Sequence, residues 1–350
     1  MPVTASDFGR REFIAFIGGM TAWTLASHAQ GAERMRRIGM LMNLSGSDPE
    51  APIRVAAFLQ RLQELGWTDR RNIQIDYRLV STDSDQQKVV AELIALEPDI
   101  LVVNGTAMLK AVQQATKSVP IVFVNVIDPV GQGFIQSLEH PGGNITGLSN
   151  IGPEMGPKWL QLLKEIAPHV KQVAVVGATT LSGATGIETT IGAAARSLGV
   201  KVIPFTARVA AEIEHSIRAL GLRPSLLGPQ PFDVANTGLI VLPGAVTRGR
   251  REQIISLVAR GQLPAIYPYR YYVTGGGLLS YGVDTADGYR RAAVYVDRIF
   301  KGEKPADLPV QQESKFELVI NLKTAAELSL EVPGTLLMRA DEVIGRPNAS

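Results

Sequence analysis

The chain has 350 residues, of which 45% are hydrophobic and 19% are charged, so it can bury the cores of two α/β domains and is not expected to be disordered. Its formal net charge of +2, with acids and bases interspersed, offers no basic face to a nucleic acid. It contains no cysteine, which excludes thiol catalysis, cysteine-ligated zinc, disulfides and a lipid-modified N-terminal cysteine.

Residues 1–29 have the pattern of a secretory signal peptide. Arg10 and Arg11 precede a weakly apolar stretch, and Ser27 and Ala29 supply the small residues that signal peptidase requires. The paired arginines favour the twin-arginine export route. A membrane anchor is the alternative, but the apolar stretch is short and rich in glycine for a bilayer span. We therefore expect a mature chain that begins near Gln30 and resides in the periplasm.

From Arg37 onward, short apolar runs alternate with amphipathic segments, which predicts buried parallel strands separated by helices. In the first half, the predicted strands are 38–42, 73–78, 100–104 and 121–126, and the predicted helices are about 51–65, 84–96 and 107–117. In the second half, the predicted strands are 173–176, 201–205, 239–242 and 265–267, and the predicted helices are about 156–166, 186–198, 209–221 and 248–260.

The two halves also share sequence patterns at and before their predicted strands. The segment 99–105 matches 238–244, and Val119-Pro120 before one strand matches Leu263-Pro264 before another. All βαβ units share some of this pattern, but the common order and spacing indicate two similar Rossmann-like lobes with parallel sheets. The remaining strands (276–282 and 318–321) and helices (286–300 and 325–330) are expected to cross between the lobes as a multi-strand hinge. The predicted first lobe is 37–148 plus about 277–308, and the second is 149–276 plus about 309–345.

Motifs for catalysis and for cofactors are missing from the sequence. It has no GxxxxGK[ST] phosphate loop and no GxSxG elbow, and its histidines are scattered without metal-ligand spacing. We therefore expect no catalytic residues, no metal and no cofactor. An enzyme with two Rossmann-like lobes, such as a glycosyltransferase, is the rival hypothesis, and it would require a nucleotide site that the sequence does not display.

Several stretches resemble one family of ABC-type solute-binding proteins, within which members with aromatic amino-acid ligands are known. They include Phe58-Leu-Gln-Arg-Leu-Gln-Glu-Leu-Gly-Trp67, Pro141-Gly-Gly-Asn-Ile-Thr-Gly147 and Gly276-Gly-Leu-Leu-Ser-Tyr-Gly-Val-Asp284, and the resemblance extends over nearly all of 37–345. It implies a type I periplasmic binding fold that holds a small-molecule solute between its lobes and delivers it to an ABC permease in the inner membrane. We expect a monomer. A sensory binding protein that docks a receptor would have the same site.

The expected site lies where loops follow the carboxyl ends of parallel strands. On the first lobe the resemblance points to three loops, whose candidates are Asn43, Leu44, Ser45, Asn104, Gly105, Thr106, Asn125 and Asp128. Ser45, Thr106 and Asp128 could instead cap helices. The second lobe departs from the family pattern, and its small, glycine-containing loops offer Thr179, Thr180, Ser182 and Gly244. Tyr269 and Tyr281 are aromatic candidates that could also complete a core or the hinge.

Overall fold

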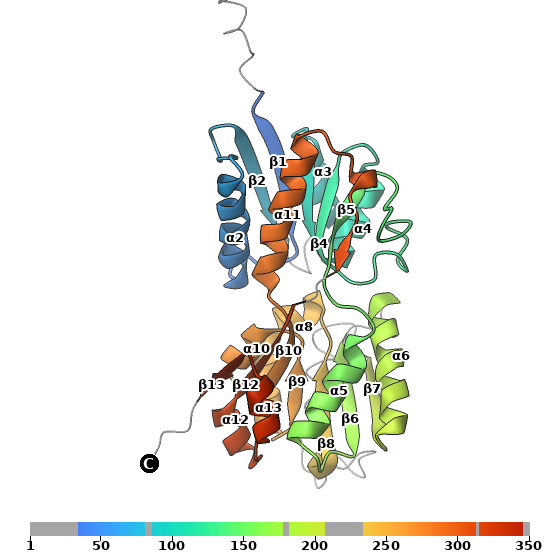
Figure 1. The fold of residues 1–350 in the computed structure, drawn as a ribbon, viewed down its shortest axis with the longest axis vertical. Coiled ribbons are helices and arrows are strands. Elements are labelled where there is room, and N and C mark those ends of the chain that lie inside the picture. Colours follow the sequence, from blue (N-terminus) through green and yellow to red (C-terminus); the bar gives the residue numbers. More distant parts are fainter. Residues whose placement is uncertain (1–33, 81–85, 178–181, 207–233, 313–314, 346–350) are drawn as a thin grey trace, which may run out of the picture.

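The structure is a computed structural model that describes residues 34–80, 86–177, 182–206, 234–312 and 315–345. The chain forms two α/β lobes, one above the other in Figure 1, each built around its own sheet. The expected signal peptide at 1–29 and the expected helix at 209–221 lie outside the described residues. No helix in the described ranges is both long enough and apolar enough to cross a membrane.

The first lobe contains a sheet whose six described strands lie in the order β11-β5-β4-β3-β1-β2. All neighbouring pairs are parallel. The strands are β1 (Arg36–Met42), β2 (Ile73–Leu79), β3 (Ile100–Asn104), β4 (Ile121–Val126), β5 (Ile145–Ser149) and β11 (Gln311–Gln312). The helices are α2 (Glu50–Glu64), α3 (Gln86–Ile94), α4 (Thr106–Ala115) and α11 (Thr285–Phe300), with a short 3-10 turn η3 (Pro305–Asp307).

Side chains of the first sheet alternate between two cores. Met40 and Met42 of β1 pack in one cluster with α2 and α11, whereas Leu41 between them packs in the other with α3 and α4. Successive side chains of a strand point to opposite faces of the sheet. Both faces of this sheet are therefore apolar, and helices cover both of them. Phe58 of α2 is fully buried, and burial of one such side chain contributes about 1.5–3 kcal/mol.

The second lobe contains a sheet whose seven described strands lie in the order β13-β12-β10-β9-β8-β6-β7. Only the β10–β12 pair is antiparallel among these neighbours. The strands are β6 (Gln172–Gly177), β7 (Lys201–Thr206), β8 (Thr237–Val241), β9 (Ala265–Tyr267), β10 (Leu279–Val283), β12 (Phe316–Asn321) and β13 (Glu342–Ile344). The helical segments are α5 (Met155–Ile166), α6 (Ser182–Ser197), η2 (Val234–Asn236), α8 (Ala245–Gly249), α9 (Arg251–Arg260), α10 (Arg270–Thr274), α12 (Leu322–Glu327) and α13 (Gly334–Arg339).

The chain passes between the lobes after β5, between β10 and α11, and between β11 and β12. The second and third crossings differ from the expected boundaries at 277 and 309. Residues 279–283 remain in the second lobe because β10 is hydrogen-bonded to β9 and β12. Residues 309–312 remain in the first lobe, where Val310 N–H donates to the Leu138 carbonyl at 2.7 Å and β11 pairs with β5.

Candidate functional site

A cavity of about 60 Å³ lies between the lobes, where the carboxyl ends of strands from both sheets meet. Its walls come from loops after β1, β3, β4, β8 and β9, from the body of α2 and from the first turns of α4, α8, α10 and α11. The lining residues are Asn43, Arg54, Gly105, Thr106, Ala107, Asn125, Ile127, Pro243, Gly244, Ala245, Arg248, Tyr269, Tyr271 and Thr285. Ligand pockets usually have volumes of about 300–1,000 Å³, so this cavity is smaller than a typical ligand pocket.

Asn125 is turned into the cavity by a bulge. The register between β4 and β5 shifts between Val124 and Val126, which leaves Asn125 out of the ladder, and its backbone is left-handed with φ of 57°. Asparagine tolerates this conformation better than most residues, and bulges are a common means of redirecting a side chain near a site. The Asn125 Oδ1 accepts a hydrogen bond from Asn150 Nδ2 at 3.2 Å.

The first turn of α4 presents backbone N–H groups to the cavity. Gly105 precedes this helix with φ of 87°, a conformation that favours glycine, and Thr106 and Ala107 line the cavity wall. The Thr106 Oγ1 accepts a hydrogen bond from Ile127 N–H at 3.4 Å, which ties α4 to the loop after β4. The N-terminus of a helix attracts anions because its first N–H groups have no helical partner.

Arg54 of α2 is the most deeply buried charged residue at this site, with 1% of its surface exposed. Its Nη2 lies 3.3 Å from Glu50 Oε2, and that oxygen also accepts a hydrogen bond from the Thr285 hydroxyl at 3.1 Å. Burial works against the guanidinium charge, but neighbouring tyrosines and Glu50 leave the pKa of Arg54 raised above its ordinary value. Its Nε is buried without a hydrogen-bond partner among the described residues. The cavity wall thus contains a charged donor with unused capacity.

Arg248 of α8 brings a second guanidinium from the opposite lobe. Its Nη2 donates to the backbone carbonyl of Asn43, so this side chain bridges the two lobes across the cavity. Among the described residues, no carboxylate forms an ion pair with Arg248. Two cations from opposite lobes therefore line one small cavity.

A row of stacked tyrosines forms the wall on the second lobe. Tyr267 and Tyr272 have ring centroids 4.9 Å apart, Tyr272 and Tyr271 5.0 Å, and Tyr271 and Tyr269 5.4 Å. The last two rings line the cavity. Burial raises the pKa of Tyr271 well above its ordinary value, so its hydroxyl is protonated at neutral pH and can donate. That hydroxyl has no partner among the described residues.

Two further contacts hold the lobes together beside the cavity. Asn150 Nδ2, in the first crossing, donates to the Tyr269 hydroxyl at 3.1 Å as well as to Asn125. Arg251 Nη1 lies 3.0 Å from Asp48 Oδ2. A polar groove of about 300 Å³ lies beside the Arg251–Asp48 pair and is lined by residues of 45–49 and 249–253.

The sequence profile described as ABC transporter substrate binding protein matches residues 47–344. The chain belongs to this family of substrate-binding proteins. A tyrosine-binding protein of Clostridioides difficile (strain R20291) is 25% identical over 277 residues, which cover 78% of this chain and 76% of the relative. The family expected from the sequence is thereby confirmed.

Solved structures confirm the type I periplasmic binding fold for this substrate-binding protein. A conserved domain protein of Vibrio cholerae O1 superposes with a TM-score of 0.79 at 26% identity, covering 89% of this chain and 100% of the other. An ABC domain from Streptococcus pneumoniae in complex with L-Trp superposes with a TM-score of 0.78 at 25% identity, covering 88% and 99%.

Six of the candidates named from the sequence line the cavity of this family member: Asn43, Gly105, Thr106, Asn125, Gly244 and Tyr269. Ser45 lies on the adjoining polar groove instead. Asn104 precedes Gly105, is 1% exposed, and has neither amide atom hydrogen-bonded among the described residues. Whether these residues contact a ligand stays a prediction.

The structure places the other candidates elsewhere. Leu44 packs in the core of the first lobe, and the Asp128 carboxylate accepts from Gly131 N–H within its own turn at 2.9 Å. Tyr281 stacks on Phe316 at 5.6 Å between centroids, away from the cavity lining, because β10 pairs with β12. Thr179 and Thr180, and the side chain of Ser182, lie outside the described part of the chain.

Arg54, Arg248 and Tyr271 are lining residues that sequence reasoning missed. A signal for Arg54 was present, because it stands on the buried face of α2 at helical spacing with Ala51, Ala57 and Phe58. A charged residue on an apolar helix face needs a partner or a function. For Arg248 the signal is weaker, since it consists only of a position in the first turn of the helix that follows a strand.

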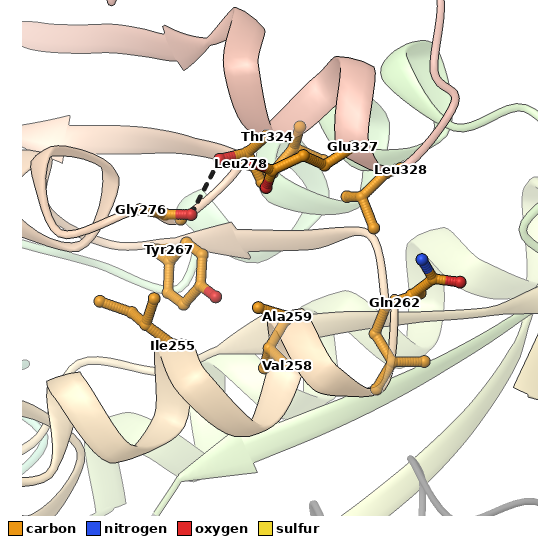
Figure 2. A pocket seen from close by; sticks show the side chains of 12 residues that line it. Ile255, Val258, Ala259, Gln262, Tyr267, Gly276, Leu278, Thr324, Glu327 and Leu328 are labelled. Carbon is orange, nitrogen blue, oxygen red and sulfur yellow. Dashed lines mark hydrogen bonds between the residues drawn. The ribbon is translucent and has the colours of Figure 1, made fainter. Parts of the chain in front are cut away.

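A second cavity, of about 50 Å³, lies within the second lobe between α9, β9 and α12. Figure 2 shows it lined mainly by apolar side chains, including Ile255, Val258 and Leu328. The buried Tyr267 hydroxyl has no partner there among the described residues. Only one lobe contributes to this cavity, so it lacks the interlobe geometry of the first. No group of three or more acidic or histidine side chains in the described ranges could hold a metal ion.

Proposed function

We propose that this protein is the exported solute-binding component of an ABC importer and that it binds a small aromatic carboxylic acid between its lobes. The cavity formed by strand ends of both sheets carries this proposal, because a ligand held there touches both lobes at once and meets aromatic rings as well as polar groups. A ligand that contacts both lobes stabilises the arrangement in which they meet, through its differential contacts. A permease in the inner membrane would then recognise the loaded, closed form.

Two observations support the ligand class. The walls of the cavity combine the stacked rings of Tyr269 and Tyr271 with the guanidinium groups of Arg54 and Arg248. Aromatic walls suit a planar group, and arginine pairs well with a carboxylate. The relatives described as tyrosine-binding and as a complex with L-Trp take ligands that contain both groups. No catalytic step is required of any residue in this arrangement.

Thermal unfolding in the presence of a panel of small solutes tests the proposal. We expect aromatic carboxylates to raise the melting temperature, because a ligand that binds only the native state stabilises it by mass action. Small-angle scattering should then show that the protein is at its most compact with that ligand. If no solute in a broad panel of amino acids, carboxylates, sugars and purines shifts the melting temperature, the proposal is wrong.

Export is tested separately. N-terminal sequencing of the protein recovered from the periplasm should begin near Gln30, as the pattern at 27–29 predicts. An intact Met1 in material confined to the cytoplasm would contradict the exported role.

A further inference from the structure

We infer that the cavity selects an aromatic acid that carries no α-ammonium group, and that Arg248 together with Arg54 enforces this selection. This inference rests on the proposed function and narrows its ligand class. An aromatic amino acid and its deaminated counterpart share the ring and the carboxylate and differ only in the ammonium charge. The charges that face the cavity decide between them.

The fixed charges around the cavity leave a positive excess. Arg54 and Arg248 line it with two positive charges, and no acidic side chain in the described ranges is among the lining residues. Glu50 is the carboxylate paired with Arg54, and its Oε2 is already shared between Arg54 and Thr285. The three groups together carry a net charge of +1. A monocarboxylate neutralises this excess, whereas a zwitterion leaves it in place.

Other acidic groups near the site are also engaged. Asp48 pairs with Arg251, and the Asp128 carboxylate binds Gly131 N–H in its own turn. Among the described residues that line the cavity, an α-ammonium would therefore find only neutral acceptors, such as amide and hydroxyl oxygens. Removing an ammonium from water without a carboxylate partner is costly, and the nearby guanidinium groups repel it further.

The unused hydrogen-bonding capacity of the wall is also on the donor side. Arg54 Nε and the Tyr271 hydroxyl are buried without partners among the described residues, and the first turn of α4 presents backbone N–H groups. A carboxylate has only acceptor atoms and can satisfy several such donors at once. An ammonium has only donors, so it could donate to the Tyr271 hydroxyl oxygen but would leave Arg54 Nε and the backbone N–H groups unsatisfied.

Isothermal titration calorimetry at neutral pH with matched probes tests this inference. The first pair is 3-phenylpropanoate and L-phenylalanine, and the second is 3-(4-hydroxyphenyl)propanoate and L-tyrosine. We expect each deaminated acid to bind about tenfold or more tightly than its amino acid. The amine 2-phenylethylamine, which lacks the carboxylate, should bind most weakly of the five probes.

Variants at Arg248 connect the preference to the charge. Arg248→Gln should weaken binding of 3-phenylpropanoate about tenfold or more, while Arg250→Gln, an exposed arginine two residues away and outside the cavity, should leave it unchanged. Arg248→Glu should reverse the ratio between 3-phenylpropanoate and L-phenylalanine. Because both probes are measured on the same variant, a general weakening of interlobe contact cancels from that ratio.

The outcomes separate this inference from the proposed function. If the amino acids bind as tightly as the deaminated acids or more tightly, the inference is wrong and the solute-binding role stands. An unchanged ratio in Arg248→Glu, with normal thermal unfolding, would also overturn it. If none of the five probes binds while another solute raises the melting temperature, this inference is wrong and so is the proposed aromatic ligand class.

Discussion

Arg251 Nη1 on α9 of the second lobe lies 3.0 Å from Asp48 Oδ2, which precedes α2 of the first lobe. Both side chains are largely buried, with 13% and 5% of their surfaces exposed. The guanidinium of Arg251 also lies over the Tyr271 ring, 5.4 Å from its centroid. Each lobe supplies one charge, so the lobes cannot separate without breaking this pair. A partly buried pair of this kind stabilises the arrangement in which the lobes touch.

Arg251→Met should therefore shift the unliganded protein toward open forms. We expect a larger radius of gyration by small-angle scattering, with little change in the compact form at saturating ligand. Arg270→Met is the matched control, because Arg270 pairs with Glu342 inside the second lobe, with Nη2 2.6 Å from Oε2. Identical scattering from Arg251→Met and the unaltered protein would show that the pair does not control opening.

Tyr269→Phe removes the hydroxyl that accepts from Asn150 in the first crossing. We expect the free energy of unfolding to fall by about 1 kcal/mol, the usual net value of one hydrogen bond, as measured by urea denaturation. Tyr281→Phe serves as control, since no hydrogen bond of its hydroxyl is found among the described residues. Equal losses in both variants would argue against a specific role for the Asn150 contact.

Thr106→Ala should raise the Kd of 3-phenylpropanoate about tenfold, because a charge-assisted hydrogen bond contributes about 1.5–3 kcal/mol. Its contact with Ile127 N–H is also lost, so stability should fall by about 1 kcal/mol. Thr116→Ala is the control at the other end of α4, where the hydroxyl oxygen accepts from Ser118 and Val119 N–H outside the cavity. Calorimetry that finds the same Kd for Thr106→Ala and Thr116→Ala would remove Thr106 from the site.

Alkaline pH should unfold the protein through its buried tyrosines. Burial raises the pKa of Tyr289 to about 12, whereas an unfolded tyrosine titrates near 10. The unfolded chain therefore loses this proton first, so the stabilisation is complete below about pH 10 and is lost as pH rises toward 12. Urea denaturation across this window should show falling stability, by at most about 1.4 kcal/mol per pH unit for each such group.

Tyr289→Phe should reduce that slope, because phenylalanine has no proton to lose. The contribution of Tyr267, Tyr271 and Tyr272, whose pKa values burial also raises, would remain. A slope that is the same in Tyr289→Phe as in the unaltered protein would contradict the assignment of this titration to Tyr289.

Strongly apolar strands were predictable from the sequence almost residue by residue. The strand predicted at 100–104 has those same bounds as β3, since a run of buried aliphatic residues between turn residues permits little else. The strand at 145–149 was missed because Ile145–Ser149 mixes threonine, glycine and serine with its apolar residues. The helix predicted at 248–260 is broken at Arg250, where α8 ends and α9 begins, and Gly249 directly before it is the residue that marks the break.

The cavity was predictable only in part for a physical reason. Loops after parallel strands lie at one edge of a sheet, and the family resemblance pointed to three of these loops, so Asn43, Thr106 and Asn125 could be named from the sequence. Arg54 reaches the cavity from the body of a helix, and its burial depends on how α2 packs beside α11. This packing joins segments more than two hundred residues apart. The apolar periodicity of a short stretch of sequence therefore cannot predict it.

The position of α11 has a consequence for how the chain is made. Tyr289, Ala292 and Val296 of this helix complete the core against α2, and β11 closes the edge of the same sheet. The N-terminal lobe therefore cannot reach its final form on the ribosome until residues beyond 312 have emerged. Domains usually fold in the order in which they are synthesised, but here the N-terminal lobe cannot complete its fold until nearly the whole chain has been made. Truncation before α11 should therefore leave the first lobe without part of its core and without its edge strand β11.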